Sequence, residues 1–419
     1  MKDFGLLSFS IVSNNSFANI IYSPKIRKLL FLNNSKSRLT EDIVIFHYCP
    51  LFLTAISLDF FSINDMELSG AEILVKSLTD HHLNTYFGYQ GSCIMQVMDC
   101  FYDNKQIEHI LVRHEQGAVH AACGYAYYAN KPGVVLVTSG PGATNTVTGI
   151  ADAYNSGIPL IVITGQVAST MLGTDAFQEA DMINITSSIT KWNCQIRKAD
   201  QIADAVYKAI KIATSDRPGP VLLDITKDAQ TGKAEYCPAT KPIDCNCISA
   251  IIPSELVNFP QKKLYDEIIQ ILKNSAKDIL LAVDKIPNDF YIEGYFEGSK
   301  VIKSKLLGVS GFGLPAAIGA RYAMPDKTVC LVVGELEFQA TIKELGIILE
   351  QGLDVKMAIL THSANNMFEV IHPDFIKIAS AYGIKGYRVA KKENLAKDIQ
   401  EMLNYKGSYL LEINEDLFK

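Results

Sequence analysis

Short, largely apolar stretches recur through this chain without the polar–apolar alternation of a half-exposed strand. Segments with the apolar spacing of helices separate them, and the clearest of the stretches are TYFGY (85–89), EHILV (108–112), VVLVTS (134–139), PLIVIT (159–164) and PVLLDI (220–225). A strand that is apolar on both faces has to be covered on both faces, as in a parallel sheet between two layers of helices. The sequence therefore predicts an α/β fold with a doubly wound parallel sheet.

The same rhythm resumes in the last third of the chain, with strands predicted at 328–333, 355–360 and 408–413 and helices at 340–351, 373–382 and 392–404. The intervening stretch holds one helical pattern and one strand, which is too little for a domain of ordinary size. We therefore expect two α/β domains joined by a shortened central segment. The predicted boundaries are an extension at 1–65, a first domain at 66–231, the central segment at 232–300 and an incomplete second domain at 301–419.

The first 65 residues differ from the rest. Residues 1–40 carry one acidic residue against six Lys or Arg, and residues 43–61 form an apolar run about as long as a membrane span. A membrane helix is disfavoured by His47, Pro50 and Asp59. A transit peptide is a second interpretation, and the preferred one is an upstream extension outside the fold. Met66 is followed at once by a helix-starting capping box, Ser69 with Glu72.

Composition narrows the class of partner. A formal net charge of −6 gives no basic surface for nucleic acid. The nine cysteines are scattered without zinc-ligand spacing, which is typical of a reducing cytoplasm, although a transit peptide would indicate an organelle. We expect a protein that acts on small molecules and binds neither nucleic acid nor a membrane.

Two motifs follow predicted strands. Glu115 comes directly after strand 108–112, and SGPGATN (139–145) ends strand 134–139. The carboxyl ends of parallel strands share one edge of the sheet, where ligands bind. Taken singly, neither motif decides the function: Glu115 also suits the positive end of a helix dipole, and the glycines also suit a tight turn.

Taken together and in order, six segments of the first domain closely resemble the pyrimidine-binding domain of acetolactate synthase, the acetohydroxyacid synthase large subunit. They are FGYQGS (87–92), RHEQGA (113–118), TSGPGATN (138–145), ITGQV (163–167), GTDAFQE (173–179) and RPGPVLLDITKD (217–228). In the second domain GFGLPAAIGA (311–320) and PDFIKIASAYG (373–383) resemble the diphosphate-binding domain of the same family.

The resemblance implies thiamine-diphosphate-dependent condensation of pyruvate with a second 2-oxoacid, pyruvate or 2-oxobutyrate, with loss of CO₂, in branched-chain amino-acid biosynthesis. Glu115 matches the catalytic glutamate that hydrogen-bonds the cofactor's aminopyrimidine ring, and Gln178 matches a glutamine beside its amino group. Phe177 and Lys191 match residues of the substrate channel. Further positions that the resemblance assigns to cofactor binding are Gly88, Tyr89, Gly91, Ser139, Gly140, Pro141, Gly142, Thr144, Asn145, Gly308, Gly311 and Gly334.

The resemblance also implies partners. In this family the site is shared between domains of two subunits, so a homodimer is expected, and a small regulatory subunit is a further possible partner. The family's central domain binds FAD. Because that domain is reduced here to 232–300, FAD is not expected to bind.

The second domain departs from the family. Where the family has Gly-Asp-Gly this chain has Gly334, Glu335 and Leu336, and His362 stands at the position of an asparagine that helps to bind Mg²⁺. Mg²⁺ needs near-ideal octahedral geometry, and a longer acid and an imidazole disturb it, so a metal site at Glu335 and His362 is doubtful. Asn365 and its neighbour would substitute only in a shifted register. Without a metal, Glu335 simply starts a turn.

Other departures point in the same direction. The chain omits the mobile segment that covers the cofactor in the family, Gln90 and Ser92 alter the family's Gly-Tyr-Pro-Gly-Gly loop, and Ser310 replaces a supporting methionine. Two functional interpretations stay open. One is an active enzyme of this type, and the other is an inactive or decaying homologue, or a binding subunit that pairs with an intact large subunit.

Overall fold

The computed structural model describes residues 9–13, 16–20, 67–238, 263–275, 277–284, 300–362 and 373–418. The chain divides into two compact units, Met1–Phe61 and Ser62–Lys419. In the first unit, β1 (Phe9–Ser13) pairs with β2 (Ser16–Ile20) in an antiparallel hairpin. The apolar run 43–61 and the two asparagines at 365 and 366 lie outside the described residues. No helix within the described ranges is long and apolar enough to cross a membrane.

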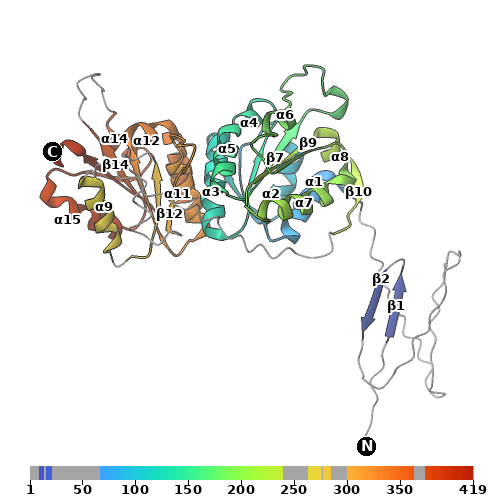
Figure 1. Ribbon diagram of the computed structural model, residues 1–419, viewed down its shortest axis with the longest axis horizontal. Helices are drawn as coiled ribbons and strands as arrows, with labels where there is room; N and C mark the ends of the chain where they lie inside the picture. The colour runs from blue at the N-terminus through green and yellow to red at the C-terminus, as the bar shows by residue number, and fades with distance from the viewer. Residues whose placement is uncertain are drawn as a thin grey trace, which may run out of the picture. The chain divides into compact units, whose positions relative to one another are not determined.

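The first α/β domain is built on a six-stranded parallel sheet, which confirms the predicted fold class (Figure 1). Its strand order is β5-β4-β6-β7-β9-β8. The strands are β4 (Thr85–Gly88), β5 (Glu108–Leu111), β6 (Gly133–Val137), β7 (Leu160–Gln166), β8 (Trp192–Ile196) and β9 (Pro220–Thr226). The helices are α1 (Gly70–Asp80), α2 (Met95–Asp103), α3 (Glu115–Ala129), α4 (Pro141–Thr144), α5 (Val147–Ser156), α6 (Met182–Thr186), α7 (Ile202–Thr214) and α8 (Lys227–Thr231).

Alternate side chains of this sheet enter two different cores. Val134 and Leu136 of β6 pack with α1, α2 and α7, whereas Val135 and Val137 pack with α3 and α5. Both sets are fully or almost fully buried. This is why the strand sequences are continuously apolar.

The chain enters this domain as predicted. Ser69 caps α1 by accepting a hydrogen bond from the Glu72 amide at 3.2 Å, and the Glu72 carboxylate accepts one from the Ser69 amide at 2.7 Å. The short strand β3 (Glu67–Ser69) pairs antiparallel with β10 (Lys233–Glu235), so the entry and exit of the domain lie side by side.

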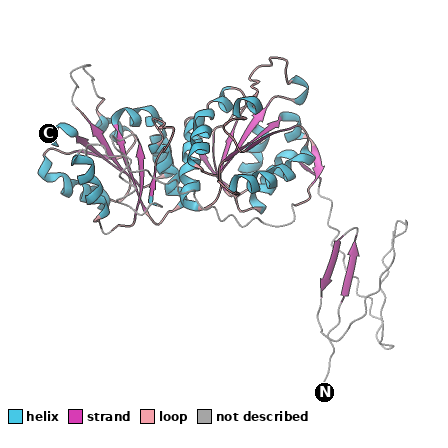
Figure 2. Cartoon of the chain, in the orientation of Figure 1, coloured by secondary structure: helices cyan, strands magenta, loops and turns pink. Residues whose placement is uncertain are grey.

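The second α/β domain also has a sheet covered by helices (Figure 2). It is six-stranded and parallel, with the order β12-β11-β13-β14-β16-β15. The strands are β11 (Ile279–Asp284), β12 (Val301–Ile302), β13 (Thr328–Gly334), β14 (Val355–Thr361), β15 (Lys385–Arg388) and β16 (Tyr409–Asn414). The helices are α9 (Lys263–Lys273), α11 (Gly313–Ala323), α12 (Glu335–Thr341), α13 (Leu345–Gln351), α14 (Phe375–Ala381) and α15 (Leu395–Asn404).

The structure assigns part of the expected central segment, 232–300, to the second domain. Strand β11 pairs with β13 inside the second sheet, and Leu264, Ile268 and Leu272 of α9 share a core with Leu281 of β11. The helix and the strand that the sequence showed in this stretch are therefore part of the second domain.

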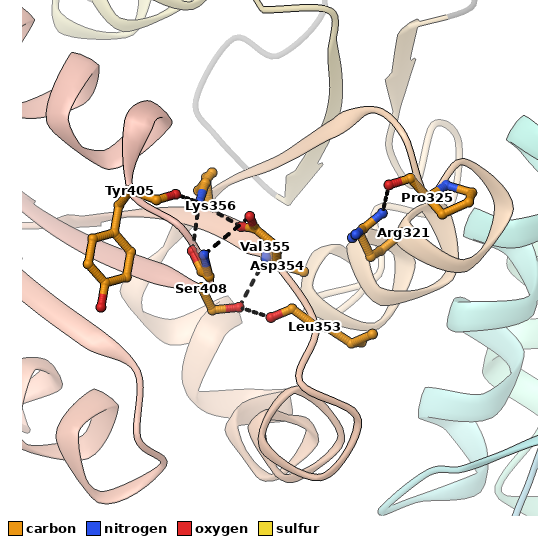
Figure 3. Close-up of polar contacts among 9 residues, drawn as sticks. Arg321, Pro325, Leu353, Asp354, Val355, Lys356, Tyr405 and Ser408 are labelled. Carbon is orange, nitrogen blue, oxygen red and sulfur yellow. Dashed lines mark hydrogen bonds and ion pairs between the residues drawn. The ribbon is translucent and has the colours of Figure 1, made fainter.

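A buried lysine fixes the amino-terminal edge of the second sheet (Figure 3). The Lys356 ammonium, at the start of β14, lies 2.6 Å from a carboxylate oxygen of Asp354 and donates to the carbonyl oxygens of Tyr405 and Gly407, each at 2.6 Å. Ser408 continues the contact by accepting a hydrogen bond from the Val355 amide at 3.0 Å. These bonds join the start of β14 to the turn before β16.

Helices α3 and α11 lie side by side (Figure 1), and residues of both belong to one buried core. A Cβ atom added to Gly319 would lie 1.8 Å from the Ala121 carbonyl oxygen, and one added to Gly124 would lie 2.0 Å from the Ala316 carbonyl oxygen. Only glycine allows backbones to approach this closely. The contact fixes α3, whose first residue is Glu115.

Candidate functional site

Glu115 and the glycine segment after β6 meet at one edge of the first sheet, as the sequence predicted. The Glu115 side chain is buried, with the residue 8% exposed. The Asn145 side-chain amide donates a 3.0 Å hydrogen bond to Oε2 of Glu115. On the other side, a Cβ on Gly142 would lie 3.4 Å from Oε1 of Glu115. One carboxylate oxygen is therefore held, and the other faces a residue without a side chain.

The start of the glycine segment meets the loop that carries Gln178. Gly140 has a φ of 57°, and a Cβ there would lie 2.9 Å from the Gln178 Cα. Ser139 is 1% exposed, and its hydroxyl has no hydrogen-bond partner among the described residues. Pro141 begins α4, and the Thr144 hydroxyl donates to the Pro141 carbonyl at 3.3 Å. The segment thus presents its backbone to the site.

The loop after β4 lies against the same region. A Cβ on Gly88 would meet the Leu136 carbonyl oxygen at 2.4 Å, and one on Gly91 would meet the Thr138 side chain at 2.4 Å. Both glycines are therefore explained by close packing, Gly88 at the end of β4 against β6 and Gly91 in the loop against Thr138 just after β6. Tyr89 is 38% exposed. A role of these three residues in cofactor binding stays a prediction.

Two residues, Phe177 and Lys191, are predicted to line the substrate channel, and only Phe177 lies near the residues around Glu115. Phe177 is 88% exposed and stands next to Gln178, whose side-chain oxygen accepts a 3.4 Å hydrogen bond from the Ser92 hydroxyl. Lys191 precedes β8 and so lies at the opposite, amino-terminal edge. Its ammonium donates to the carbonyls of Ile212 and Ser215 at the end of α7. The structure does not join Lys191 to the group around Glu115.

In the second domain the glycines of the loop before α11 adopt the backbone that glycine favours. Gly308 has a φ of 62° and Gly311 a φ of 88°. A Cβ on Gly311 would also approach the Thr341 side chain to 3.0 Å. Gly334 is different, because it precedes α12 with an ordinary φ of −70°. The first two positions therefore require glycine, whereas Gly334 does not need it for its backbone angle.

Glu335 and His362 come together at the carboxyl edge of the second sheet. His362 Nδ1 lies 3.4 Å from Oε1 of Glu335, which is 2% exposed, and Leu336 is 57% exposed beside them. The described residues contain no group of three or more His, Cys, Asp or Glu side chains placed to hold a metal ion. Mg²⁺ prefers six oxygen ligands, so this acid and imidazole do not make an ordinary Mg²⁺ site.

Glu344 is a candidate that the sequence did not indicate. One of its carboxylate oxygens accepts a 3.0 Å hydrogen bond from the Arg113 amide, and the other lies 2.6 Å from where a Cβ of Gly117 would be. Burial raises the pKa of Glu344 to about 7, and the negative charge of Glu115 contributes to the rise. A protonatable carboxyl of the second domain therefore lies against the first turn of α3. The sequence around Glu344, KEL, is typical of a solvent-exposed helix face, so it did not indicate a buried carboxylate.

Comparison with known proteins finds a family match for each of the two α/β domains. Residues 68–185 match the family model "Thiamine pyrophosphate enzyme, N-terminal TPP binding domain". Residues 291–372 and 361–413 match the model "Thiamine pyrophosphate enzyme, C-terminal TPP binding domain". The two matches fall on the first and second α/β domains.

Similar proteins include the mitochondrial acetolactate synthase catalytic subunit of Saccharomyces cerevisiae, 26% identical over 83% of this chain and 81% of the relative. The acetolactate synthase isozyme 2 large subunit of Escherichia coli is 26% identical over 83% of this chain and 96% of the relative. That alignment spans 526 positions against 419 residues in this chain, so it contains long gaps. The Buchnera aphidicola large subunit is 52% identical over 38% of this chain and 28% of the relative. Both α/β domains are thus similar to those of thiamine pyrophosphate enzymes, and the chain as a whole resembles acetolactate synthases.

Proposed function

We propose that this chain condenses pyruvate with a second 2-oxoacid, with loss of CO₂, in a reaction of the acetolactate synthase type that depends on thiamine diphosphate. The observation that carries the proposal is the environment of Glu115. Its carboxylate is buried at the start of α3, is oriented by the Asn145 amide, and faces Gly142. That arrangement suits a group that exchanges a hydrogen bond with a ring nitrogen.

When bound, thiamine diphosphate would supply the electron sink for decarboxylation. The protein's contribution is orientation and proton transfer. Asn145 fixes one oxygen of Glu115, which leaves the other to share a proton with the pyrimidine ring. The backbone at Gly140 and Gly142 packs closely against Gln178 and Thr138, which fixes this segment beside Glu115, and the buried Ser139 hydroxyl is a further polar group in the same segment.

In the second domain, the loop from Gly308 to Gly311 would receive the diphosphate. Its two positive φ angles turn the backbone sharply just before α11, an eleven-residue helix that begins at Gly313. Amides at a helix start favour anions. Glu335 and His362 offer one carboxylate and one imidazole, which is not the set of oxygen ligands that Mg²⁺ prefers.

A non-catalytic role is the second candidate, and one observation favours it. Leu336 is 57% exposed next to the buried Glu335, where a diphosphate and its metal would need open space and oxygen ligands. Such a protein would be an inactive homologue, or a subunit that pairs with an intact large subunit and lends it Glu115. In either role we propose association with a second chain, either another copy or an intact large subunit, and a small regulatory subunit as a further partner.

Calorimetry with thiamine diphosphate, in Mg²⁺ and again in EDTA, combined with an acetolactate assay, separates these functions. The active-enzyme proposal expects binding and product from the wild type. For Glu115→Gln it expects turnover to fall by about 10²- to 10⁴-fold with a smaller change in affinity. Glu67→Gln, an exposed carboxylate on β3, is the control and should behave as the wild type. Absence of acetolactate, with or without binding of the cofactor, would support the non-catalytic role, and absence of binding would refute the active-enzyme proposal.

A further inference from the structure

The loop between β7 and α6 is tied to one of its own side chains. The Glu179 carboxylate turns back and accepts hydrogen bonds from the backbone amides of Gly173 and Ala176, the second at 3.2 Å. These backbone bonds lower the pKa of Glu179, the bond from Gly173 most of all. The carboxylate therefore closes the loop as an internal anion surrounded by main-chain donors.

The closed loop holds an unfavourable backbone. Besides Gly173, with a φ of 75°, two residues with side chains have positive φ angles, namely Asp175 at 57° and Gln178 at 63°. Such conformations are strained for residues other than glycine, and they persist only where neighbouring interactions fix them. The two strained residues stand on either side of Ala176 and Phe177, next to the amide that Glu179 binds.

This strained backbone determines what the loop presents to the site. Gln178 lies against Gly140, where a Cβ would be 2.9 Å from the Gln178 carbonyl oxygen. Its side chain meets the Ser92 hydroxyl at 3.4 Å, and Phe177 extends into solvent at 88% exposure. Because its side chain is this exposed, the backbone of the loop sets where Phe177 lies.

We propose that Glu179 is a positioning residue for the condensation, acting through Gln178 and Phe177. Its carboxylate binds the loop amides and so keeps Gln178 against the glycine segment beside Glu115, with Phe177 exposed next to it. The role in turnover rests on the proposed function, whereas the tether itself does not. An ionised carboxylate suits the task because both of its oxygens only accept hydrogen bonds, whereas a glutamine offers one acceptor and one donor.

The test compares Glu179→Gln with the control Asp181→Asn in the full chain. Asp181 is a carboxylate two residues further on, and it accepts from the Asn184 amide at 3.1 Å as the cap of α6, not from the loop. The first readout is amide hydrogen exchange of residues 170–180 without any ligand. Losing a charge-assisted bond should speed exchange of the Gly173 and Ala176 amides by about tenfold in Glu179→Gln and leave them unchanged in the control.

The second readout is cleavage by chymotrypsin after Phe177, identified by the mass of the fragments. A fixed loop resists the protease although the ring is exposed, because cleavage requires the segment to extend into the protease cleft. We expect clearly faster cleavage at this bond in Glu179→Gln and no change in Asp181→Asn. The third readout is kinetic: the KM for the 2-oxoacid should rise more than kcat falls, because Glu179 positions Phe177, which the resemblance assigns to the substrate channel.

The outcomes separate the two proposals. Unchanged exchange and unchanged cleavage in Glu179→Gln would overturn the tether. Faster exchange and cleavage, with kinetic constants equal to those of Asp181→Asn, would overturn the positioning role. If the wild type makes no acetolactate, the proposed function fails and the positioning role in turnover falls with it, while exchange and cleavage still decide whether Glu179 holds the loop.

Discussion

Replacing Lys356 with alanine should strongly destabilise the second domain. The residue lies far from the candidate site, so the effect is one on stability. Lys356 is 2% exposed, and its ammonium lies within 2.6 Å of Asp354 and of the carbonyls of Tyr405 and Gly407. Truncation removes three buried methylene groups, at about 0.8 kcal/mol each. It also leaves two carbonyls without their donor.

Leaving these two carbonyls without a donor costs less free energy than it would if both were fully buried. Tyr405 is exposed and Gly407 is partly exposed, so water can reach their carbonyls. Asp354 has a side chain 39% exposed, which also limits the loss. Together with the methylene groups, we expect a decrease of about 3 kcal/mol in the free energy of unfolding. Lys356→Met keeps most of the apolar stem and should lose about 1 kcal/mol.

Urea denaturation followed by circular dichroism measures these differences. Lys327→Ala is a matched control, because that lysine pairs with Asp278 while its side chain is 39% exposed. Exposed pairs contribute little, so the midpoint of this control should not move measurably. The reasoning would be refuted if Lys356→Met were as damaging as Lys356→Ala, or if the exposed control matched the buried variant.

Two further predictions concern the contacts between the domains. Gly319→Ala would place a methyl group 1.8 Å from the Ala121 carbonyl oxygen, so α3 and α11 must separate. We expect a loss of about 1–3 kcal/mol in urea denaturation and weaker thiamine diphosphate binding, and an unchanged midpoint would contradict the close contact. Because the pKa of Glu344 is raised to about 7 in the folded protein, its protonated form is favoured, and wild-type stability should fall as pH rises from about 4.5 to 7. In Glu344→Gln the denaturation midpoint should change less with pH across this range than in the wild type. If the midpoints of both proteins changed equally with pH, the raised pKa of Glu344 would be refuted.

The fold could be predicted where a short stretch of sequence is enough to indicate its own secondary structure. Buried parallel strands have no polar face, so β6, β7 and β9 are visible as continuous apolar runs. Strand β8 (Trp192–Ile196) was missed, because it is an edge strand whose sequence, WNCQI, mixes polar and apolar residues and is only partly buried. In the described sheet β8 pairs only with β9, which lies between β8 and the other strands. No pattern within the sequence of β8 indicates this position.

The candidate site was predictable to the extent that it follows strand ends. Glu115 and Asn145 meet because β5 and β6 end at the same edge, and that follows from parallel pairing alone. Glu344 was missed because its burial depends on contact with α3, which comes from the other domain. Lys191 points away from the site because the lysine precedes its strand, and a matched motif does not show at which edge a residue lies.

The contact between α3 and α11 has a consequence for how the site responds to heat. Side-chain contacts loosen gradually, because each rotatable bond samples more rotamers as temperature rises. Gly124 and Gly319 have no such bonds, and main chain faces main chain at both crossings. The separation between the two α/β domains of the chain should therefore stay nearly constant on warming until the helices part as a unit. Loss of cofactor binding would then be abrupt, coinciding with unfolding rather than preceding it.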